Sequence, residues 1–448
     1  MSQSHSTDSS AAHSNSQKRL RVAFIMVAIA FLGGAFAPAS RAQGGNADAF
    51  PQRKADLSKI VFVGDSLTAG FQSDSLIDTA QPHGWANLVA VQAGTPLSLP
   101  LIAPPGIPPI LELVSAGPPP IIITAPGTST GRDDPFVQAT DLGVPGALVN
   151  DALNTKPTLP INAGNILTDL ILGVPGLAEG KDLTQVGWAQ ALQPTTIFVW
   201  IGNNDILGAA AAADPSLATP SATFQSEFKQ LLDKLEKTHA TIVVANIPDV
   251  TAIPFFTSAE TIAKEVGLPL SVIGPILGIQ AGDLVTPEGV ALIPGILADP
   301  STGPLPSSVV LTAAKVTQTQ SILRSYNAII EIEAIAHGAT VVNIHALSVI
   351  TAEFGILADG KHLTNAFLGG LFSLDGVHPT NTGYAVIANA FIETLNHQLG
   401  NKIPLISINQ VAKTDPLVFG SVGAVNRGHV DAKTAAAMKA TILRPGPH

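Results

Sequence analysis

The chain has no cysteine among its 448 residues, and this absence excludes several kinds of site. Without cysteine there is no thiol nucleophile, no thiolate metal ligand, no disulfide and no lipoprotein attachment residue. Charged residues are also scarce, at 12%, whereas apolar residues reach 46%. A chain of this length and composition can bury a large core, so the sequence predicts a folded globular protein rather than a disordered or coiled-coil one.

Aromatic platforms and several catalytic motifs are missing as well. The sequence holds only three tryptophans and two tyrosines, which are few for a site that stacks on sugar rings. It contains no phosphate-binding P-loop and no His-Glu-x-x-His zinc motif, and no Gly-x-Ser-x-Gly elbow surrounds Ser66, the serine considered below. The formal net charge of −10 argues against nucleic acid as a partner.

The N-terminus has the pattern of an export signal. Lys18, Arg19 and Arg21 form a basic cluster, residues 22–36 are almost uninterruptedly apolar, and small residues follow up to Ala42. The apolar run is shorter than the ~20 residues that span a bilayer, which favours cleavage over a retained membrane anchor. We therefore expect a signal peptide over residues 1–42, a flexible leader over 43–56, and a secreted or periplasmic protein.

Short β-branched runs alternate with helical patterns along the rest of the chain. Inner strands are predicted at residues 60–63, 196–201, 241–247 and 340–344, and helices at 85–92, 221–237, 316–336 and 381–399. This alternation predicts an α/β fold with a parallel, doubly wound sheet and right-handed crossovers.

Two apolar insertions and a C-terminal segment do not follow this alternation. Residues 95–135 are rich in proline, which excludes regular helix and inner strand there, and residues 254–315 are rich in glycine and proline with few charges. We expect long apolar loops that line a site with hydrophobic side chains, extra core being the alternative. No helix or strand is predicted for residues 401–448, which are interpreted as a tail, an added edge strand or a partner-binding arm.

A serine follows the first predicted strand directly, in the block Gly64-Asp65-Ser66-Leu67-Thr68. Gly64 allows a sharp turn, which places Ser66 at the carboxyl edge of the sheet, where open α/β folds bind their ligands. A serine at this position is either a helix N-cap or a nucleophile.

A candidate base and its partner precede the last predicted helix. Asp375 and His378 lie three residues apart on one loop, so the carboxylate can orient the imidazole while the far ring nitrogen faces a serine. Taken alone, such a pair also fits a surface loop.

Donors for a developing oxyanion are available at the same sheet edge. They are the backbone N–H of Ser66, the N–H of Gly146, and the side-chain amide of Asn204, which follows the second strand. Glycine and asparagine are also ordinary turn residues, and Gly146 could serve only a tight bend.

The four blocks together resemble the GDSL esterase/lipase family, also called SGNH hydrolases. The Gly64-Asp65-Ser66-Leu67 block resembles the nucleophile motif, and the stretch 142–146 resembles the second motif. Residues 202–205 fit the Gly-x-Asn-Asp motif, and residues 375–378 fit the last one. The resemblance implies a three-layer α/β/α sandwich with a parallel, flavodoxin-like sheet over about residues 57–400.

The resemblance also implies roles for individual residues. Ser66 would be the nucleophile, His378 the base with Asp375 as its orienter, and Asn204 and Gly146 the oxyanion donors. The second motif departs from the family pattern, because it begins with Asp141 where asparagine is frequent and lies far along the chain from Ser66. Gly143 therefore remains the second candidate for the oxyanion glycine.

The function expected from these features is that of a secreted serine ester hydrolase. It would cleave carboxylic esters with aliphatic acyl groups through an acyl-serine intermediate, without metal or cofactor. Expected partners are a small-molecule or lipid ester, with transient contact to a lipid interface. Two alternatives stay open: an O-acetyl esterase acting on carbohydrate or peptidoglycan, and a catalytically silent secreted binding protein.

Overall fold

The computed structural model describes residues 54–117, 120–161 and 163–418. The predicted signal peptide (1–42), the first residues of the expected leader (43–53) and the last part of the C-terminal segment (419–448) lie outside these residues. Among the described residues, no helix is both long enough and apolar enough to cross a membrane.

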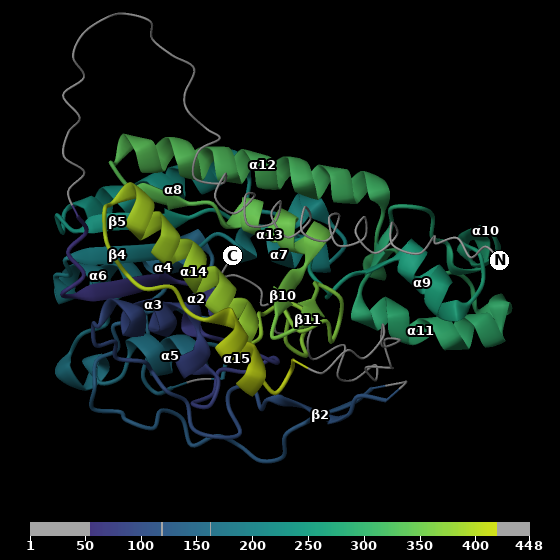
Figure 1. Cartoon of the computed structure of the whole chain (residues 1–448), viewed down its shortest axis with the longest axis horizontal. Coiled ribbons are helices and arrows are strands. Elements are labelled where there is room, and N and C mark those ends of the chain that lie inside the picture. The colour runs from purple at the N-terminus through teal and green to yellow at the C-terminus, as the bar shows by residue number, and fades with distance from the viewer. Residues whose placement is uncertain (1–53, 118–119, 162, 419–448) are drawn as a thin grey trace, which may run out of the picture.

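Four parallel strands form the central sheet (Figure 1). They are β1 (Ile60–Gly64), β4 (Thr196–Trp200), β5 (Thr241–Ala245) and β9 (Thr340–Val342), and they pair in the order β1-β4-β5-β9. All four lie at the predicted places, with ends shifted by a residue or two. Apolar side chains occupy both faces of these strands, as expected for strands covered on both sides.

Residues 140–144 extend the sheet on the free edge of β1. The N–H of Phe62 donates to Thr140 O (3.0 Å), and the N–H of Leu142 donates to Phe62 O (2.9 Å). Phe62 and Asp141 form a parallel bridge, and the N–H of Val144 donates to Gly64 O at 3.0 Å. When this short stretch is counted as a strand and the strands are numbered along the chain, their order across the sheet is 2-1-3-4-5, which is the flavodoxin-like arrangement.

Helices cover both faces of the sheet, and the alternation of side chains along each strand explains why. Val61 and Val63 of β1 belong to one apolar cluster with α4 (Val149–Asn154), α6 (Gln185–Leu192), α8 (Ser221–Glu236) and α12 (Ala313–Ala336). Ile60 and Phe62 point the other way, into a second cluster with α3 (Trp85–Ala93), α13 (Ile344–Phe354) and α14 (Asn381–Gln398). The fold is therefore a three-layer α/β/α sandwich, as predicted.

The remaining elements connect these layers. They include α2 (Ser66–Ala69), α5 (Ile166–Leu172), α7 (Asn204–Ala211), and the antiparallel pair of β10 (Ile356–Ala358) and β11 (Lys361–Leu363). Single-turn 3-10 helices occur at Gln81–His83, Gly176–Glu179, Pro215–Leu217, Pro300–Thr302 and Ser307–Val309.

The described residues of the proline-rich insertion at 95–135, which are 95–117 and 120–135, contain no helix and no strand of the main sheet, as its prolines predict. It forms a separate hairpin of β2 (Leu111–Ser115) and β3 (Ile121–Thr124), which lies below the main body in Figure 1. On the inner face of this hairpin, Leu111 and Ile122 pack against Leu374.

The insertion at 254–315 differs from the loop that its composition suggested. It folds into α9 (Ala259–Val266), α10 (Leu270–Leu277) and α11 (Pro287–Ala298) around a small sheet of β6 (Thr257–Ser258), β7 (Leu284–Val285) and β8 (Val310–Leu311). Some of its glycines and prolines mark helix ends: Gly267 and Gly278 are left-handed C-caps, and Pro287 is the first residue of α11. Others lie within helices, as Pro275 does in α10 and Pro294 in α11. The helices and the small sheet bury an apolar cluster of their own.

The described part of the C-terminal segment packs against the domain instead of forming a free tail. Ile403 and Ile406 belong to the apolar cluster under α14, and α15 (Ile408–Thr414) follows. Asp415 accepts hydrogen bonds from the N–H and the hydroxyl of Thr382, both at 2.7 Å. The folded unit therefore continues past the expected boundary at residue 400, at least to residue 418.

A stack of aromatic rings holds the α3–α14 layer to the sheet, and this stack can be tested. Phe391 of α14 is fully buried and lies parallel to Trp85 of α3, with ring centroids 3.9 Å apart. We expect Phe391→Ala to lower the free energy of unfolding by roughly 3–5 kcal/mol, because it removes a large buried ring and leaves a cavity. Urea denaturation of the purified protein measures this change.

The control is the same substitution at Phe354, whose side chain is 53% exposed at the end of α13. Phe354→Ala should change the free energy of unfolding by less than about 1 kcal/mol. Equal losses for the two variants would contradict the assignment of Phe391 to the core.

Candidate active site

Ser66 emerges directly after the first strand, where the chain reverses into a short helix. β1 ends at Gly64, and a Cβ there would clash with the Thr68 side chain and lie 2.5 Å from Trp200 O, so only glycine fits. Asp65 caps α2 by accepting the N–H of Leu67 at 3.0 Å. Ser66 is then the first residue of α2, at the carboxyl edge of the sheet.

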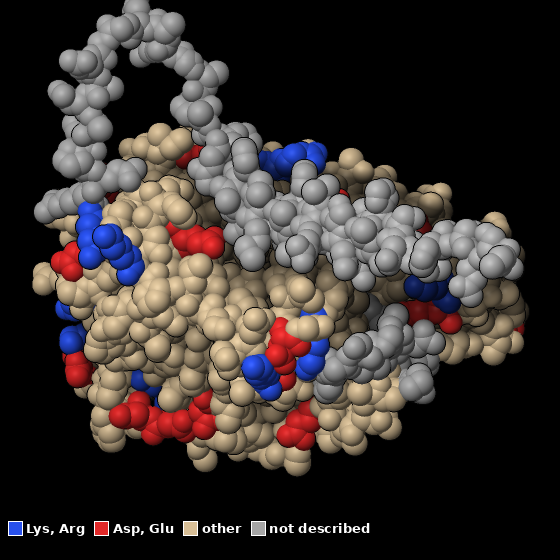
Figure 2. All heavy atoms as spheres, viewed as in Figure 1, with Lys and Arg blue, Asp and Glu red and all other residues tan. Residues whose placement is uncertain are grey.

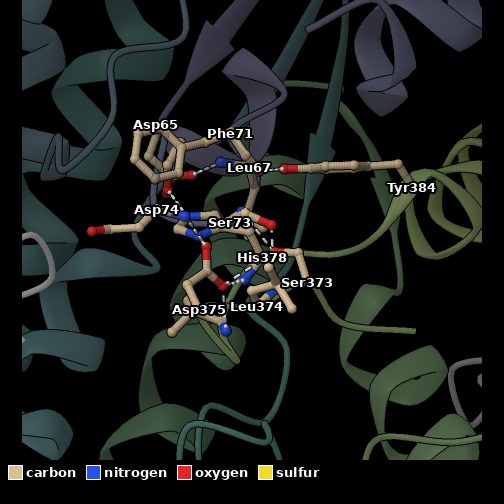
Figure 3. A network of polar contacts seen from close by, with 12 residues as sticks. Asp65, Leu67, Phe71, Ser73, Asp74, Ser373, Leu374, Asp375, His378 and Tyr384 are labelled. Atoms are coloured by element: carbon tan, nitrogen blue, oxygen red, sulfur yellow. Dashed lines mark hydrogen bonds and ion pairs between the residues drawn. The ribbon is translucent and has the colours of Figure 1, made fainter. Parts of the chain in front are cut away.

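The structure brings Ser66, His378 and Asp375 together in one hydrogen-bonded chain. Figure 3 shows the His378 and Asp375 side chains of this chain side by side. His378 Nε2 lies 2.8 Å from Ser66 Oγ, and His378 Nδ1 lies 2.9 Å from Asp375 Oδ2. An ionised carboxylate can only accept, so Nδ1 carries the hydrogen and Nε2 of the neutral ring is left to accept from the serine. All three side chains are buried although Ser66 lies more than 300 positions from the other two.

The carboxylate of Asp375 is fixed by an unusually complete set of donors. Its Oδ1 accepts the N–H groups of Val377 and His378, both at 2.8 Å, and its Oδ2 accepts the N–H of Asp74 at 2.8 Å. Burial by itself would raise the pKa of Asp375, but the neighbouring His378 and these hydrogen bonds outweigh it and lower the pKa. Asp375 is therefore held in its charged form.

The stretch after residue 141 leaves one backbone donor unused. The N–H groups of Leu142, Val144 and Ala147 donate to backbone carbonyls. Among the residues that the structure describes, the N–H of Gly146 has no acceptor, and neither has the N–H of Ser66. Gly146 has a φ of +83°, a conformation that favours glycine.

Gly143 is placed for packing rather than for donation. Its N–H donates to Asp141 Oδ1 at 3.0 Å, so it is already used. A Cβ on Gly143 would lie 2.7 Å from the backbone nitrogen of Ala69 and 3.0 Å from Asp65 O. The glycine therefore lets the chain pass close beneath the Ser66 turn, and of the two candidates Gly146 is the better oxyanion donor.

Asn204 and Asp205 both bind the stretch that carries Gly146. Asn204 is the first residue of α7, and its amide donates to Ala147 O at 3.0 Å, next to Gly146. Asp205 Oδ2 accepts the N–H of Val149 at 3.1 Å. An amide has two hydrogens, so Asn204 retains a second one for another acceptor.

Several polar and aromatic contacts at the site were not predicted from the sequence. The Phe71 ring lies against the His378 ring with centroids 4.7 Å apart, and Tyr384 donates to Phe71 O at 2.8 Å. Asn203 donates to Asp65 Oδ2 at 2.7 Å. Asn203 stands inside the Gly-x-Asn-Asp block and could have been singled out, whereas nothing in the local sequence marks Phe71 or Tyr384.

Three buried acids near the site, Asp65, Asp141 and Asp205, form no salt bridge with the residues that the structure describes. Burial raises the pKa of Asp65 to about 6, against hydrogen bonds from Asn203 and Leu67 that lower it. Burial likewise raises the pKa of Asp141 and of Asp205 to about 7. In the described part of the chain, no group of three or more His, Asp or Glu side chains could hold a metal ion.

Comparison with known proteins identifies the class first and the family second. A parallel α/β sandwich with a serine, a histidine and an acid at its carboxyl edge is an arrangement found in hydrolases. The family model of the GDSL-like Lipase/Acylhydrolase family matches residues 60–391, and the chain belongs to this family. The protein is accordingly a carboxylic ester hydrolase.

The other comparisons are distant. No curated protein matches the sequence. Among solved structures, LAE5, an α/β hydrolase enzyme from the metagenome of Lake Arreo in Spain, is 13% identical, with 77% of this chain and 97% of that chain covered and a TM-score of 0.35. Axe2, an acetylxylan esterase from Geobacillus stearothermophilus, is also 13% identical, with 77% and 96% covered and the same TM-score of 0.35.

The raised pKa of Asp141 predicts how stability depends on pH. The folded protein keeps this proton up to about pH 7, whereas the unfolded chain loses it near the ordinary aspartate pKa of 3.8. Unfolding therefore releases a proton between these pH values, and this group makes stability fall as the pH rises. Asp141→Asn removes that dependence and keeps an acceptor for the N–H of Gly143. The free energy of unfolding of this variant, measured relative to wild type, should therefore increase by a few kcal/mol from pH 4 to pH 8, because each unit between the folded and unfolded pKa values corresponds to about 1.4 kcal/mol.

Urea denaturation of both proteins across this pH range measures the difference. Asp182→Asn serves as the control, because Asp182 is exposed and its pKa is lowered by the hydrogen bond from Lys156. This control should show no such gain at high pH. A flat difference between wild type and Asp141→Asn would mean that Asp141 is ionised in the folded protein at all these pH values.

Proposed function

We propose that the protein is an exported serine esterase that cleaves aliphatic carboxylic esters through an acyl-serine intermediate. One observation carries the mechanism: the continuous hydrogen-bonded chain from Ser66 Oγ through both nitrogens of His378 to the ionised Asp375. A serine hydroxyl is a weak nucleophile, and a neutral imidazole at 2.8 Å is the base that activates it.

The reaction proceeds in two acyl transfers. Ser66 Oγ attacks the ester carbonyl carbon while His378 Nε2 takes the hydroxyl proton, and Asp375 stabilises the resulting imidazolium. The carbon–oxygen bond to the alcohol then breaks, and His378 returns its proton to the leaving oxygen. Water repeats the sequence on the acyl-Ser66 ester, which releases the carboxylic acid and restores the serine.

Three donors would stabilise the negative oxygen that forms in each step. The N–H groups of Ser66 and Gly146 have no acceptor among the described residues, and Asn204 retains one amide hydrogen beyond its bond to Ala147 O. Donors that are fixed in place before the reaction stabilise the transition state without reorganisation. The bond between Asn204 and Ala147 holds the amide beside Gly146, which supports a joint role.

The preference for an aliphatic acyl group rests on the side chains around the site. All three tryptophans and both tyrosines are buried in the core, so none of them is free to stack on a sugar ring. The residues that pack around the catalytic loop are apolar instead: Leu374 contacts the β2–β3 hairpin, and Val377 shares a cluster with Phe255 and Phe256.

Surface charge agrees with a neutral or apolar substrate. On the face shown in Figure 2, lysine and arginine side chains occur in small separate groups, with wide uncharged areas between them. A polyanionic partner such as nucleic acid would need a continuous basic surface.

Export is inferred from the sequence of residues 1–42 alone, where a basic cluster precedes an apolar run and small residues.

Hydrolysis of p-nitrophenyl esters from acetyl to palmitoyl tests both the mechanism and the acyl preference. We expect activity to be highest on a medium or long acyl chain, and Ser66→Ala to lower kcat by roughly 10⁴-fold or more. Unimpaired activity of Ser66→Ala would exclude the acyl-serine mechanism. An optimum at acetyl would favour a carbohydrate O-acetyl esterase, and no activity of the folded protein on any ester would favour a silent binding protein.

The oxyanion role of Asn204 has a separate expected outcome. Asn204→Ala should lower kcat by about 100- to 1000-fold with little change in KM, because the lost donor acts mainly in the transition state. Steady-state kinetics on the preferred ester measures this split.

Asn396→Ala is the matched control. Asn396 likewise donates to a backbone carbonyl, Ile403 O at 2.8 Å, but it lies on α14 under the C-terminal segment. This variant should be somewhat less stable and fully active. If Asn204→Ala changes kcat no more than Asn396→Ala does, Asn204 is not an oxyanion donor.

A further inference from the structure

A tight turn just after the nucleophile helix has an uncommon backbone conformation. Gln72 and Ser75 exchange both backbone hydrogen bonds, at 3.0 and 2.9 Å, so Ser73 and Asp74 are the two central residues of a hairpin turn. Both have positive φ, +48° and +62°. Turns of this kind usually contain Asn-Gly or Gly-Gly, because side chains disfavour the left-handed region.

This conformation directs two successive N–H groups at the catalytic loop (Figure 3). The N–H of Ser73 donates to Ser373 Oγ at 2.9 Å, and the N–H of Asp74 donates to Asp375 Oδ2 at 2.8 Å. Oδ2 is the same oxygen that binds His378 Nδ1. The Ser373 hydroxyl in turn donates to Asp375 Oδ1 at 3.3 Å, so both N–H groups act on one carboxylate.

The proline-rich insertion supports the turn from the other side. The N–H of Leu111, at the start of β2, donates to Ser73 O at 2.9 Å. Leu76 and Ile107 exchange backbone hydrogen bonds at 3.1 and 3.0 Å, which pairs the insertion with the chain that follows the turn. The turn is therefore bonded to the insertion on one side and to the catalytic loop on the other.

We propose that the Gln72–Ser75 turn is a positioning element for the reaction, and that its left-handed residues hold the Asp74 N–H on Asp375 so that this carboxylate orients His378. The inference rests on the proposed acyl-serine mechanism. In this arrangement the insertion at 95–135 serves the catalytic acid through the turn, in addition to any contact with substrate. Strained backbone that is held by its surroundings is a recurrent feature of functional sites.

A pair of substitutions at Asp74 separates the backbone from the side chain. Asn and Thr both remove the carboxylate at similar size, but Asn tolerates positive φ, whereas the β-branched Thr disfavours it. In the full-length protein, Asp74→Thr should lower kcat by about 10- to 100-fold with KM unchanged, because a misplaced catalytic group costs rate. Asp74→Asn should stay within about threefold of wild type.

Two further measurements distinguish positioning from general destabilisation. The rate of covalent capture of Ser66 by diisopropyl fluorophosphate, which also needs an oriented His378, should fall in Asp74→Thr as kcat does. Gln193→Thr is the matched control, because Gln193 has a φ of +47° at the exposed C-cap of α6. It should lower the melting temperature and leave both rates unchanged.

The proposal is overturned if Asp74→Thr keeps the wild-type kcat and capture rate, or if Asp74→Asn loses as much as Asp74→Thr. A rise in KM at constant kcat would also overturn it, because the turn would then act on substrate binding. Ser66→Ala separates this inference from the mechanism on which it rests. If Ser66→Ala is inactive and Asp74→Thr is fully active, the mechanism stands and only the role of the turn fails.

Discussion

A buried carboxylate needs hydrogen-bond donors, and the arrangement of this site depends on how Asp375 obtains them. Its donors come from its own loop, from the His378 ring and from the turn at Ser73 and Asp74, which lies some 300 positions earlier in the chain. Without them, the charge would be costly to bury, and the acid would take up a proton. Because the same donors fix the direction of both oxygens, keeping the charge and orienting the imidazole are one structural requirement.

The sheet supplies the frame for this requirement. Parallel strands bring their carboxyl ends to one edge, so the residues that follow β1 and β4 meet there although they are far apart in the sequence. Close contacts between backbone segments at Gly64 and Gly143 then fix the positions of the loops at this edge. Gly64 and Gly143 sit where a Cβ would collide with neighbouring backbone, and the stretch that carries Gly146 consequently passes directly under the Ser66 turn. Two glycines without catalytic function thus determine where the candidate oxyanion donor lies.

The features that the sequence predicts are those set by local patterns, and the features that it does not predict depend on contacts between distant segments. The strands were predictable because each is a local run of buried apolar residues, and Ser66, Asn204 and His378 were predicted as site residues because short motifs carry them. The Ser73–Asp74 turn was not, since its left-handed residues are non-glycine and only contacts with distant segments impose that conformation. The helices of 254–315 were not predicted because their glycines and prolines resemble the composition of a loop. The packing of residues 401–418 was not predicted because it depends on distant partners such as Thr382.

The entry of the chain into the domain has a geometric consequence. Ala55 exchanges hydrogen bonds with Asn401, and Asp56 O accepts the hydroxyl of Thr196, so the chain enters at the amino ends of the strands. Ser66 lies past the opposite ends, about 16 Å away along the five residues of β1. If the chain were attached at Ala55 to a surface, a carrier or a second enzyme, the attachment would therefore lie at the edge of the sheet opposite Ser66. The edge that carries Ser66 would remain accessible to substrate.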